Sequence, residues 1–339
     1  MIRSTDPRPG AIATPTGAPA RGRASRGRGA VRVSDLPAHV QSPDRRVDVG
    51  GVEIDVLTES ATVATVMRDL AEGRGGVMVT VNLDHVRRCR SDAAYRDLVA
   101  RSELVVADGM PLVWASRVQG TPLPERVAGS NLVWSLCREC AAGGRRVFLL
   151  GGDPGAAEGA RSVLESTFSG LRVCGVLCPE RGFERDEARL ASIEGEVVSS
   201  GADVVFVALG SPKQEYLGER LHLAMPRAWF VGCGISLSFV AGQVSRAPMW
   251  MQRCGLEWAH RLAQEPRRLA RRYLIDGMAF GAVLMGGAVW RRASGWGRRP
   301  APGAGRLAVI GRSGRRRREN LARVEEPAGL DAGVNRRAG

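Results

Sequence analysis

Residues 204–215 read VVFVALGSPKQE, and this stretch decides the fold. Its first six residues are all apolar, which is typical of a central parallel strand that is covered on both faces. Gly210 permits a tight turn, Ser211 is a favoured N-cap and Pro212 is a favoured first helical residue. We therefore expect the strand to lead directly into a helix, whose free N–H groups favour a bound anion.

Lys213, Gln214 and Glu215 follow this turn and are candidates for substrate binding, together with Gly210 itself. Lys213 is the only lysine among the 49 lysine and arginine residues of the chain. Where arginine occupies every other basic position, a lysine beside a strand-to-helix turn indicates a compact point charge at a binding site. The alternative is an ordinary solvated residue in the first turn of a helix.

Length and charge limit the classes of protein. A chain of 339 residues accommodates one α/β domain of about 200 residues with appendages. The formal net charge of +14 indicates an anionic partner, which is nucleic acid, a phosphorylated substrate or an anionic membrane surface. The seven cysteines, an odd number, fit reduced thiols in the cytosol.

Cys137 and Cys140 with Cys174 and Cys178 resemble a zinc ligand set only superficially. The first pair falls in an amphipathic helix and the second flanks a strand, so we expect no metal there.

Both ends of the chain are rich in arginine and glycine. Residues 1–46 are predicted to be a disordered arm and residues 293–339 a disordered basic tail. The start of the chain lacks the apolar core of a signal peptide, and no apolar stretch reaches the roughly 20 residues of a membrane-spanning helix. These ends leave open a different class of function, a basic nucleic-acid-binding protein that acts through its tails.

Strand-like and helix-like segments alternate between residues 47 and 244. This order predicts an α/β fold with a doubly wound, mostly parallel Rossmann-like sheet and helices on both faces. The expected strands are 52–56, 76–81, 104–107, 146–150, 171–177, 202–209 and 228–232, and the expected helices are 61–71, 93–101, 131–142, 155–167, 186–199 and 213–223. Ligands of such folds bind outside the carboxyl ends of the strands, where this chain places Thr80, Asn82, Asp108 and several glycines. We expect a pocket at that edge.

Asp108 directly follows the strand 104–107 in mostly apolar surroundings. A general base needs such partial desolvation to raise its pKa towards the working pH, although an aspartate here could instead cap the next helix. Arg126 follows a loop interrupted by prolines and could bind a diphosphate with both arms of its guanidinium group. The alternative interpretation is that Arg126 forms a surface ion pair with Glu125.

Residues 149–160, LLGGDPGAAEGA, resemble a dinucleotide-binding turn but lack the G-x-G-x-x-G fingerprint and the acidic residue expected about 20 positions later. A nicotinamide-dependent oxidoreductase is therefore the less favoured enzyme class, and we expect no cofactor. Because no D-x-D pair is placed to hold a metal-bound nucleotide, metal-free chemistry is the simpler assumption.

Residues 245–292 are predicted to form a helical appendage. Arg261, Arg268 and Arg271 share one side of a helix if Pro266 allows the helix to continue. Residues 277–290 are uncharged, apolar and too short to span a membrane, and beside an arginine-rich helix they indicate attachment to an anionic membrane surface. The alternative is a terminal helix that packs on the core or in the interface of a homo-oligomer.

Four motifs, in this order, closely resemble the WecG/TagA/CpsF family of bacterial glycosyltransferases, over about residues 48–274. They are TVNLDHV (80–86), ADGMPLVWASRVQGTPLPERVAGSNL (107–132), GSPKQE (210–215) and VAGQVSRAPMWMQRCGLEWAHRLAQEPRRLARRYL (240–274).

The resemblance implies transfer of an N-acetylhexosamine, typically N-acetylmannosamine, from a UDP donor to a sugar linked to undecaprenyl diphosphate. The reaction would invert the anomeric centre without a metal, at the cytoplasmic face of the cell membrane, in the synthesis of a cell-envelope polysaccharide such as teichoic acid or exopolysaccharide. The appendage would touch the membrane peripherally and complete the active site.

The resemblance also implies roles for single residues. Asp108 would be the base, Thr80 and Asn82 would line the sugar pocket, and Arg126 and Gln214 would bind substrate. Arg261, Arg268 and Arg271 would reach the diphosphate from the appendage. Ser238, in GCGISLSF, stands where the family commonly has an acidic residue, which leaves the identity of the donor sugar open.

Overall fold

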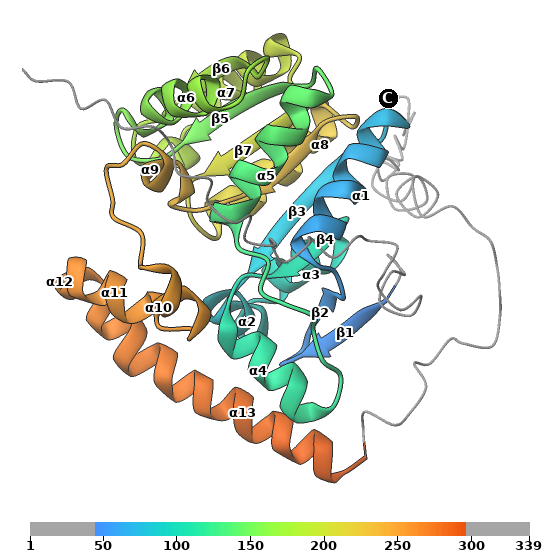
Figure 1. Cartoon of the computed structure of the whole chain (residues 1–339), viewed down its shortest axis with the longest axis vertical. Coiled ribbons are helices and arrows are strands. Elements are labelled where there is room, and N and C mark those ends of the chain that lie inside the picture. The colour runs from blue at the N-terminus through green and yellow to red at the C-terminus, as the bar shows by residue number, and fades with distance from the viewer. Residues whose placement is uncertain (1–44, 296–339) are drawn as a thin grey trace, which may run out of the picture.

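The computed structural model describes residues 45–295, so the expected basic arm and basic tail lie almost entirely outside the described residues (Figure 1). Its main sheet has six strands, all parallel. In spatial order they are β4 (Leu104–Ala107), β3 (Gly76–Val81), β8 (Trp229–Gly232), β7 (Val204–Ala208), β5 (Arg146–Gly151) and β6 (Arg172–Leu177). The parallel arrangement places all their carboxyl ends at one edge of the sheet.

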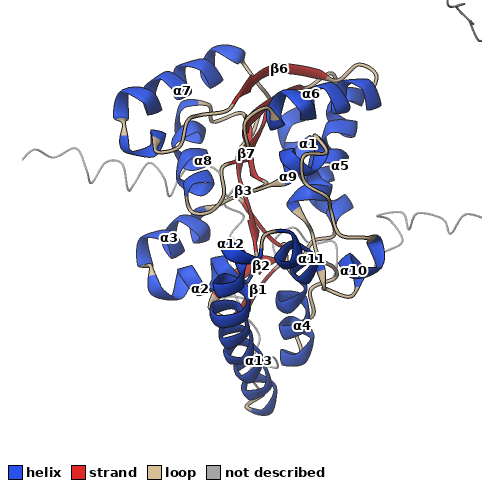
Figure 2. Cartoon of the chain, turned by 90° about the vertical axis from the view of Figure 1, so that its left-hand side faces the viewer, coloured by secondary structure: helices blue, strands red, loops and turns tan. Residues whose placement is uncertain are grey.

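Helices cover both faces of this sheet (Figure 2). One face carries α2 (Leu83–Ser91), α3 (Ala93–Arg101), α7 (Glu187–Ser200) and α8 (Lys213–Ala224), and the other carries α1 (Glu59–Ala71), α5 (Gly129–Ala142), α6 (Ala156–Thr167) and α9 (Ser236–Val240). A short 3-10 helix, η3 (Phe183–Arg185), precedes α7. The doubly wound fold is confirmed.

The central strand β7 shows why this sequence folds in layers. Val205 and Val207 belong to the hydrophobic core under one face, whereas Val204, Phe206 and Ala208 belong to the core under the other. All five side chains are buried. An uninterrupted apolar run is therefore needed here, because neither face of the strand meets water.

The turn after β7 differs from the prediction because the helix begins one residue later than Pro212, the expected first helical residue. The helix α8 begins at Lys213, Pro212 is its N-cap, and the Ser211–Pro212 peptide bond is cis. Ser211 is not the N-cap that we expected, because its hydroxyl shares a hydrogen bond of 2.9 Å with the Tyr95 hydroxyl. Gly210 adopts a φ of +72°, as the tight turn requires.

A two-stranded antiparallel hairpin precedes the main sheet, and the sequence analysis predicted only its second strand. The hairpin consists of β1 (Arg46–Val49) and β2 (Val52–Asp55). Asp55 anchors it, since its carboxylate accepts a hydrogen bond of 2.9 Å from Arg46 Nε and one of 2.7 Å from the backbone N–H of Val105 in β4.

The appendage is a chain of short helices followed by a long one. Its helices are α10 (Met249–Arg253), α11 (Glu257–Gln264), α12 (Pro266–Ala270), the π-helical segment η4 (Arg271–Gly277) and α13 (Met278–Ala293). The continuous helix from Arg261 to Arg271 is absent from this part of the structure, because the chain leaves the helical conformation at Glu265, where φ is −131° and ψ is 61°. A proline disfavours the helical conformation of the residue before it.

The last helix is longer than the apolar segment predicted from the sequence. The π-helical segment runs into α13, and together they form a helix of 23 residues, Arg271–Ala293. By length and composition alone it is the one helix among residues 45–295 that could cross a membrane, which corrects the expectation that the segment is too short. Only 11 % of its most apolar 18-residue window is buried.

The buried side of α13 packs against α4 (Met110–Gln119) and against the hairpin turn. Leu284 is buried against Gly50 and Val86, and Arg291 forms an ion pair with Asp48. Gly50 has a φ of +69°, and a Cβ atom at this position would lie 2.7 Å from Leu284 Cδ1 and 2.9 Å from Val86 Cγ1. The hairpin turn thus needs glycine for both its conformation and its contact with α13.

Replacing Gly50 by alanine is expected to lower the free energy of unfolding more than the same change at Gly51. Both glycines have positive φ, but a Cβ atom at Gly51 meets nothing within 4 Å. Gly51→Ala should therefore cost only the left-handed backbone strain, about 1–2 kcal/mol, and Gly50→Ala a further ~1–3 kcal/mol from overpacking. Urea unfolding of the two variants measures the difference, and equal losses would contradict the tight packing of α13.

Candidate active site

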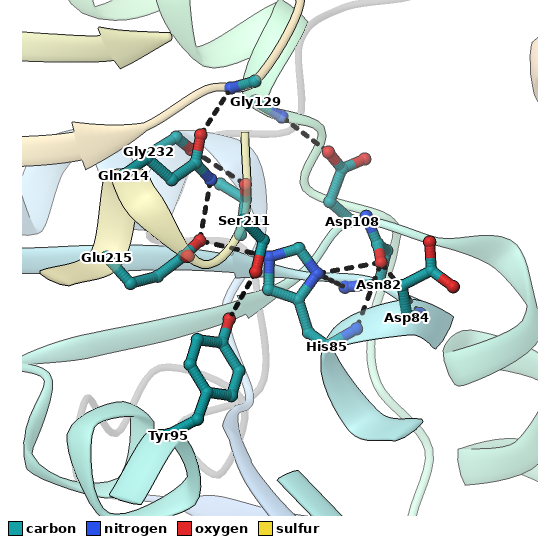
Figure 3. Close-up of polar contacts among 12 residues, drawn as sticks. Asn82, Asp84, His85, Tyr95, Asp108, Gly129, Ser211, Gln214, Glu215 and Gly232 are labelled. Carbon is teal, nitrogen blue, oxygen red and sulfur yellow. Dashed lines mark hydrogen bonds and ion pairs between the residues drawn. The ribbon is translucent and has the colours of Figure 1, made fainter. Parts of the chain in front are cut away.

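Thr80 and Asn82 lie at the carboxyl end of β3. The Thr80 hydroxyl donates a hydrogen bond of 2.8 Å to the carbonyl of Gly232, at the end of β8. Asn82 caps α2, since its Oδ1 accepts a hydrogen bond of 3.0 Å from the N–H of Asp84 and a longer one from the N–H of His85. The Thr80 side chain is thereby tied to the end of β8, and the Asn82 side chain is fixed by the turn that follows β3 (Figure 3).

Asp108 lies immediately after the neighbouring strand β4. Its backbone N–H donates to the carbonyl of Val81, 2.7 Å away, and its Oδ2 accepts a hydrogen bond of 3.2 Å from the N–H of Gly129 at the start of α5. A Cβ atom placed on Gly129 would lie 3.5 Å from Thr80 Oγ1. Asp108, Gly129 and Thr80 therefore form one cluster.

The surroundings of Asp108 shift its acidity. Burial raises the pKa of the Asp108 carboxyl group, and this effect exceeds the opposing effects of the Arg126 charge and of the Gly129 hydrogen bond. The charge of Glu257 raises the pKa further. Asp108 as a whole residue is half-buried at the edge of the sheet. A carboxylate with a raised pKa that a substrate can reach is a stronger base than an ordinary aspartate.

Gln214 and Glu215 begin α8, opposite these groups. Gln214 Oε1 accepts a hydrogen bond of 3.0 Å from the N–H of Gly234, and its Nε2 donates to Glu215 Oε1 at 2.8 Å. A Cβ atom on Gly232 would lie 2.9 Å from Gln214 Nε2, so Gln214 packs directly on the strand end that Thr80 contacts. Glu215 is only 2 % exposed and lies beneath the site.

The appendage contributes charged groups next to Asp108. Arg126 Nη1 lies 2.8 Å from Glu257 Oε2 in α11, whereas the alternative from the sequence was a pair with Glu125. Arg246 Nη2 donates to Asn131 Oδ1 at 2.8 Å, and its Nε lies 3.9 Å from Glu257 Oε1. Among the described residues that Nε has no hydrogen-bond partner. Two guanidinium groups therefore lie near Asp108, one of them with bonding capacity to spare.

The family comparison decides the class of protein. A model of the family described as "Glycosyl transferase WecG/TagA/CpsF family" matches residues 47–294 of this chain. The chain belongs to the WecG/TagA/CpsF family of glycosyltransferases.

A curated relative of this glycosyltransferase is the N-acetylglucosaminyldiphosphoundecaprenol N-acetyl-beta-D-mannosaminyltransferase of Bacillus subtilis (strain 168). The two are 31 % identical over 197 residues, which cover 58 % of this chain and 75 % of the relative. The resemblance inferred from the four sequence motifs is therefore confirmed, and the oxidoreductase alternative finds no support. The hypothesis of a nucleic-acid-binding protein rests on the two basic ends of the chain, which lie almost entirely outside the described residues.

The other predicted residues lie on α8, on α9 and on the helices of the appendage. Lys213 forms an ion pair of 2.6 Å with Glu184 in η3. Arg261 is partly exposed on α11, Arg271 is exposed at the start of η4, and the side chain of Arg268 lies outside the described part of the structure. Ser238 is buried and donates a hydrogen bond of 3.0 Å to Asp153 Oδ2.

Sequence reasoning missed His85, Arg246 and Glu257. All three lie inside the motifs quoted above, but only their contacts show what they do. It also predicted a pocket at the strand ends, which stays a prediction. Two cavities of about 420 and 440 Å³ lie elsewhere, one beneath α13 and one near Arg146 and Met225.

The cysteines do not gather around a metal site. Cys174 and Cys178 donate to the carbonyls of Val147 and Gly152, and Cys137 and Cys140 are buried in α5. Within residues 45–295 no group of three or more histidine, cysteine, aspartate or glutamate side chains is placed to hold a metal ion.

The raised pKa of Asp108 gives a prediction for stability. In the folded protein the group binds its proton more tightly than in the unfolded chain, where the pKa is about 3.9. Its favourable contribution is thus present at low pH and is lost as the pH rises through the folded-state pKa. We expect Asp108→Asn to raise the free energy of unfolding at pH 8, with a gain that vanishes near pH 4.

Urea unfolding at several pH values measures this gain, and Asp97→Asn on the exposed surface of α3 is the control. A less stable Asp108→Asn variant at pH 8 would show that the carboxylate is favourably solvated in the folded state.

Proposed function

We propose that this glycosyltransferase moves N-acetylmannosamine from a UDP donor to an N-acetylglucosamine that is linked through diphosphate to a polyprenyl lipid. The name of the Bacillus subtilis relative states the transferred sugar and the lipid-linked acceptor for that protein, and it supports the same choice here. The observation that carries the proposal is the position of Asp108, a buried carboxyl group of raised pKa beside Thr80, Asn82 and Gln214.

In the proposed reaction Asp108 acts as the general base. A hydroxyl oxygen of the acceptor sugar attacks the anomeric carbon of the donor sugar, and its proton passes to the Asp108 carboxylate. The bond between that carbon and the UDP oxygen breaks, and UDP leaves with the bonding electrons. Attack from the side opposite UDP inverts the anomeric centre, so a single base suffices.

The departing UDP needs positive charge, which we assign to arginines. Arg126 and Arg246 lie near the base, and each is close to Glu257. An incoming diphosphate would compete with Glu257 for both guanidinium groups, because arginine binds phosphate oxygens with two donors at once. Arg261, Arg268 and Arg271 would add charge from the appendage. With this many cations the reaction needs no metal to stabilise the leaving group.

We assign residues 47–244 to the catalytic core and residues 245–292 to a membrane-associating appendage. Glu257 is the link between them, since it lies in α11 and pairs with Arg126 of the core. The helix that ends at Ala293 packs along α4, so we propose that it lies on the inner face of the cell membrane and does not cross it. Its outward side exposes Ile275, Met278 and Val289. Arginines beside such an apolar face suit an anionic surface.

Asp108→Asn is expected to lower kcat by about 10²–10⁴-fold, because amide nitrogen and oxygen cannot take up the acceptor proton. The assay supplies UDP-N-acetylmannosamine with a polyprenyl-diphosphate-linked N-acetylglucosamine acceptor and detects the disaccharide lipid by mass spectrometry. UDP-N-acetylglucosamine is the control donor. Near-normal turnover of the variant would rule out Asp108 as the base, and a preference for the control donor would refute the proposed sugar.

The membrane role is tested on the exposed side of the last helix. A triple variant, Ile275→Ser, Met278→Ser and Val289→Ser, should sediment much less with phosphatidylglycerol vesicles, because each buried apolar side chain contributes about 1.5–3 kcal/mol. Leu223→Ser, at an exposed apolar residue of α8, is the matched control and should bind like the parent protein. Unchanged binding of the triple variant would place the membrane contact elsewhere.

A further inference from the structure

His85 and Glu215 form a buried pair beneath the site. His85 is 4 % exposed and Glu215 is 2 % exposed. His85 Nε2 lies 3.2 Å from Glu215 Oε1, and His85 Nδ1 lies 2.8 Å from Asn82 Oδ1 (Figure 3). The pair thus connects α8 to the residue that caps α2, and it lies between two of the proposed substrate-binding residues, Asn82 and Gln214.

The partners of the two ring nitrogens fix the protonation of His85. Asn82 Oδ1 is an oxygen and not the amide nitrogen, because it accepts hydrogen bonds from the backbone N–H groups of Asp84 and His85. His85 Nδ1 must therefore carry a proton to bond to it at 2.8 Å. The N–H of Asn82 also points at Nδ1, but at 3.4 Å it is the weaker contact.

The other ring nitrogen faces a carboxylate. Burial alone would raise the pKa of Glu215, but the hydrogen bonds that it accepts from His85, Gln214 and Ser211 act in the opposite direction, and its pKa lies below the ordinary value. An ionised carboxylate only accepts hydrogen bonds, so His85 Nε2 must donate to it. Both ring nitrogens then carry protons.

We infer that His85 is a doubly protonated imidazolium that acts as a positioning residue, holding the Asn82 and Gln214 amides with their nitrogen atoms towards the substrate.

The bonds account for this orientation. Asn82 Oδ1 is occupied by three donors around α2, so the NH₂ group is the part of the amide left for a ligand. Gln214 Oε1 accepts from the N–H of Gly234, and one hydrogen of its Nε2 points to Glu215 Oε1, the same oxygen that faces His85. One hydrogen of Nε2 remains. Both amides can therefore donate to oxygen atoms of a sugar or a phosphate.

The charge of His85 also has a structural reason. Glu215 is buried, and its Oε2 has no hydrogen-bond partner among the described residues. Leaving such a carboxylate without a cation is strongly unfavourable, and His85 is the group that can supply one. Among the described residues, Tyr95 and Asp108 also face His85. The ring centroid of Tyr95 lies 6.4 Å from that of His85, and a charge on His85 would lower the pKa of Asp108. Neither is a second cation.

Nuclear magnetic resonance of histidine ring nitrogens tests the charge directly, without substrate. The chain has four histidines, so ring-¹⁵N-labelled protein gives four pairs of ring-nitrogen signals, and His85→Phe identifies the pair of interest. We expect both nitrogens of His85 to be protonated at pH 7.5 in the parent protein. In Glu215→Gln they should lose a proton at a lower pH. A neutral His85 ring in the parent at pH 7.5 overturns the inference.

Kinetics test the positioning role, and this arm alone rests on the proposed function. His85→Gln and Glu215→Gln should each lower kcat about 10–100-fold, since a displacement of about 1 Å in a substrate-binding group costs about 10²-fold. Because the two residues act through one bond, the double variant should lose no more than either single variant. Losses that multiply in the double variant, or full activity of His85→Gln, would refute the role.

The nuclear magnetic resonance experiment and the kinetic experiment distinguish failure of the inference from failure of the proposed function. If the chain acts on another substrate, no variant comparison is measurable, but the nitrogen signals still report the charge. His222→Gln is the control for replacing a buried histidine. His222 lies on α8, contacts Glu103 and Phe230, and is outside the network of Figure 3. This variant should leave the protonation of His85 unchanged, and a change would show that the effect is not specific to the bond with Glu215.

Discussion

The hydrogen bonds between parallel strands are the constraint on which the site depends. They bring β3, β4, β8 and β7 to one edge with their carboxyl ends aligned, so that residues far apart in the sequence become neighbours. The bond from the Asp108 N–H to the carbonyl of Val81 extends the ladder by one residue, and the Thr80 hydroxyl ties β3 to the end of β8. Side chains in the turns after these strands are therefore close enough to contact one another.

Two carboxyl groups at this edge of the sheet, Asp108 and Glu215, have pKa values shifted in opposite directions by their surroundings. Around Asp108 burial dominates, so the carboxyl group tends to keep its proton and becomes basic once ionised. Around Glu215 hydrogen bonds and the charge of His85 dominate, so the carboxyl group stays ionised. Two carboxyl groups at one sheet edge are thereby given opposite tendencies, one for proton transfer and one for support.

The sequence predicted the fold well because its signals are local. The apolar run of β7, the turn glycine Gly210 and the alternation of elements follow from neighbours in the chain. Asp108 could be predicted for the same reason, as a carboxylate at a strand end. Glu257 could not be predicted, because its role depends on the packing of α11 against Arg126, which is 131 residues away in the sequence. His85 reads as an ordinary helix residue until the distance to Glu215 is known. Ser211 looked like a cap because Tyr95, its partner, is distant in sequence.

The ion pair between Lys213 and Glu184 has a practical consequence. As the chain contains a single lysine, an amine-selective reagent finds one internal target, whose side chain is 40 % exposed and belongs to the residue just before Gln214. A fluorophore attached there, once reaction at the chain's own α-amino group is blocked, reports from a defined place at the junction of β7 and α8. The skewed composition thus provides a ready-made attachment point for spectroscopy without any engineered cysteine.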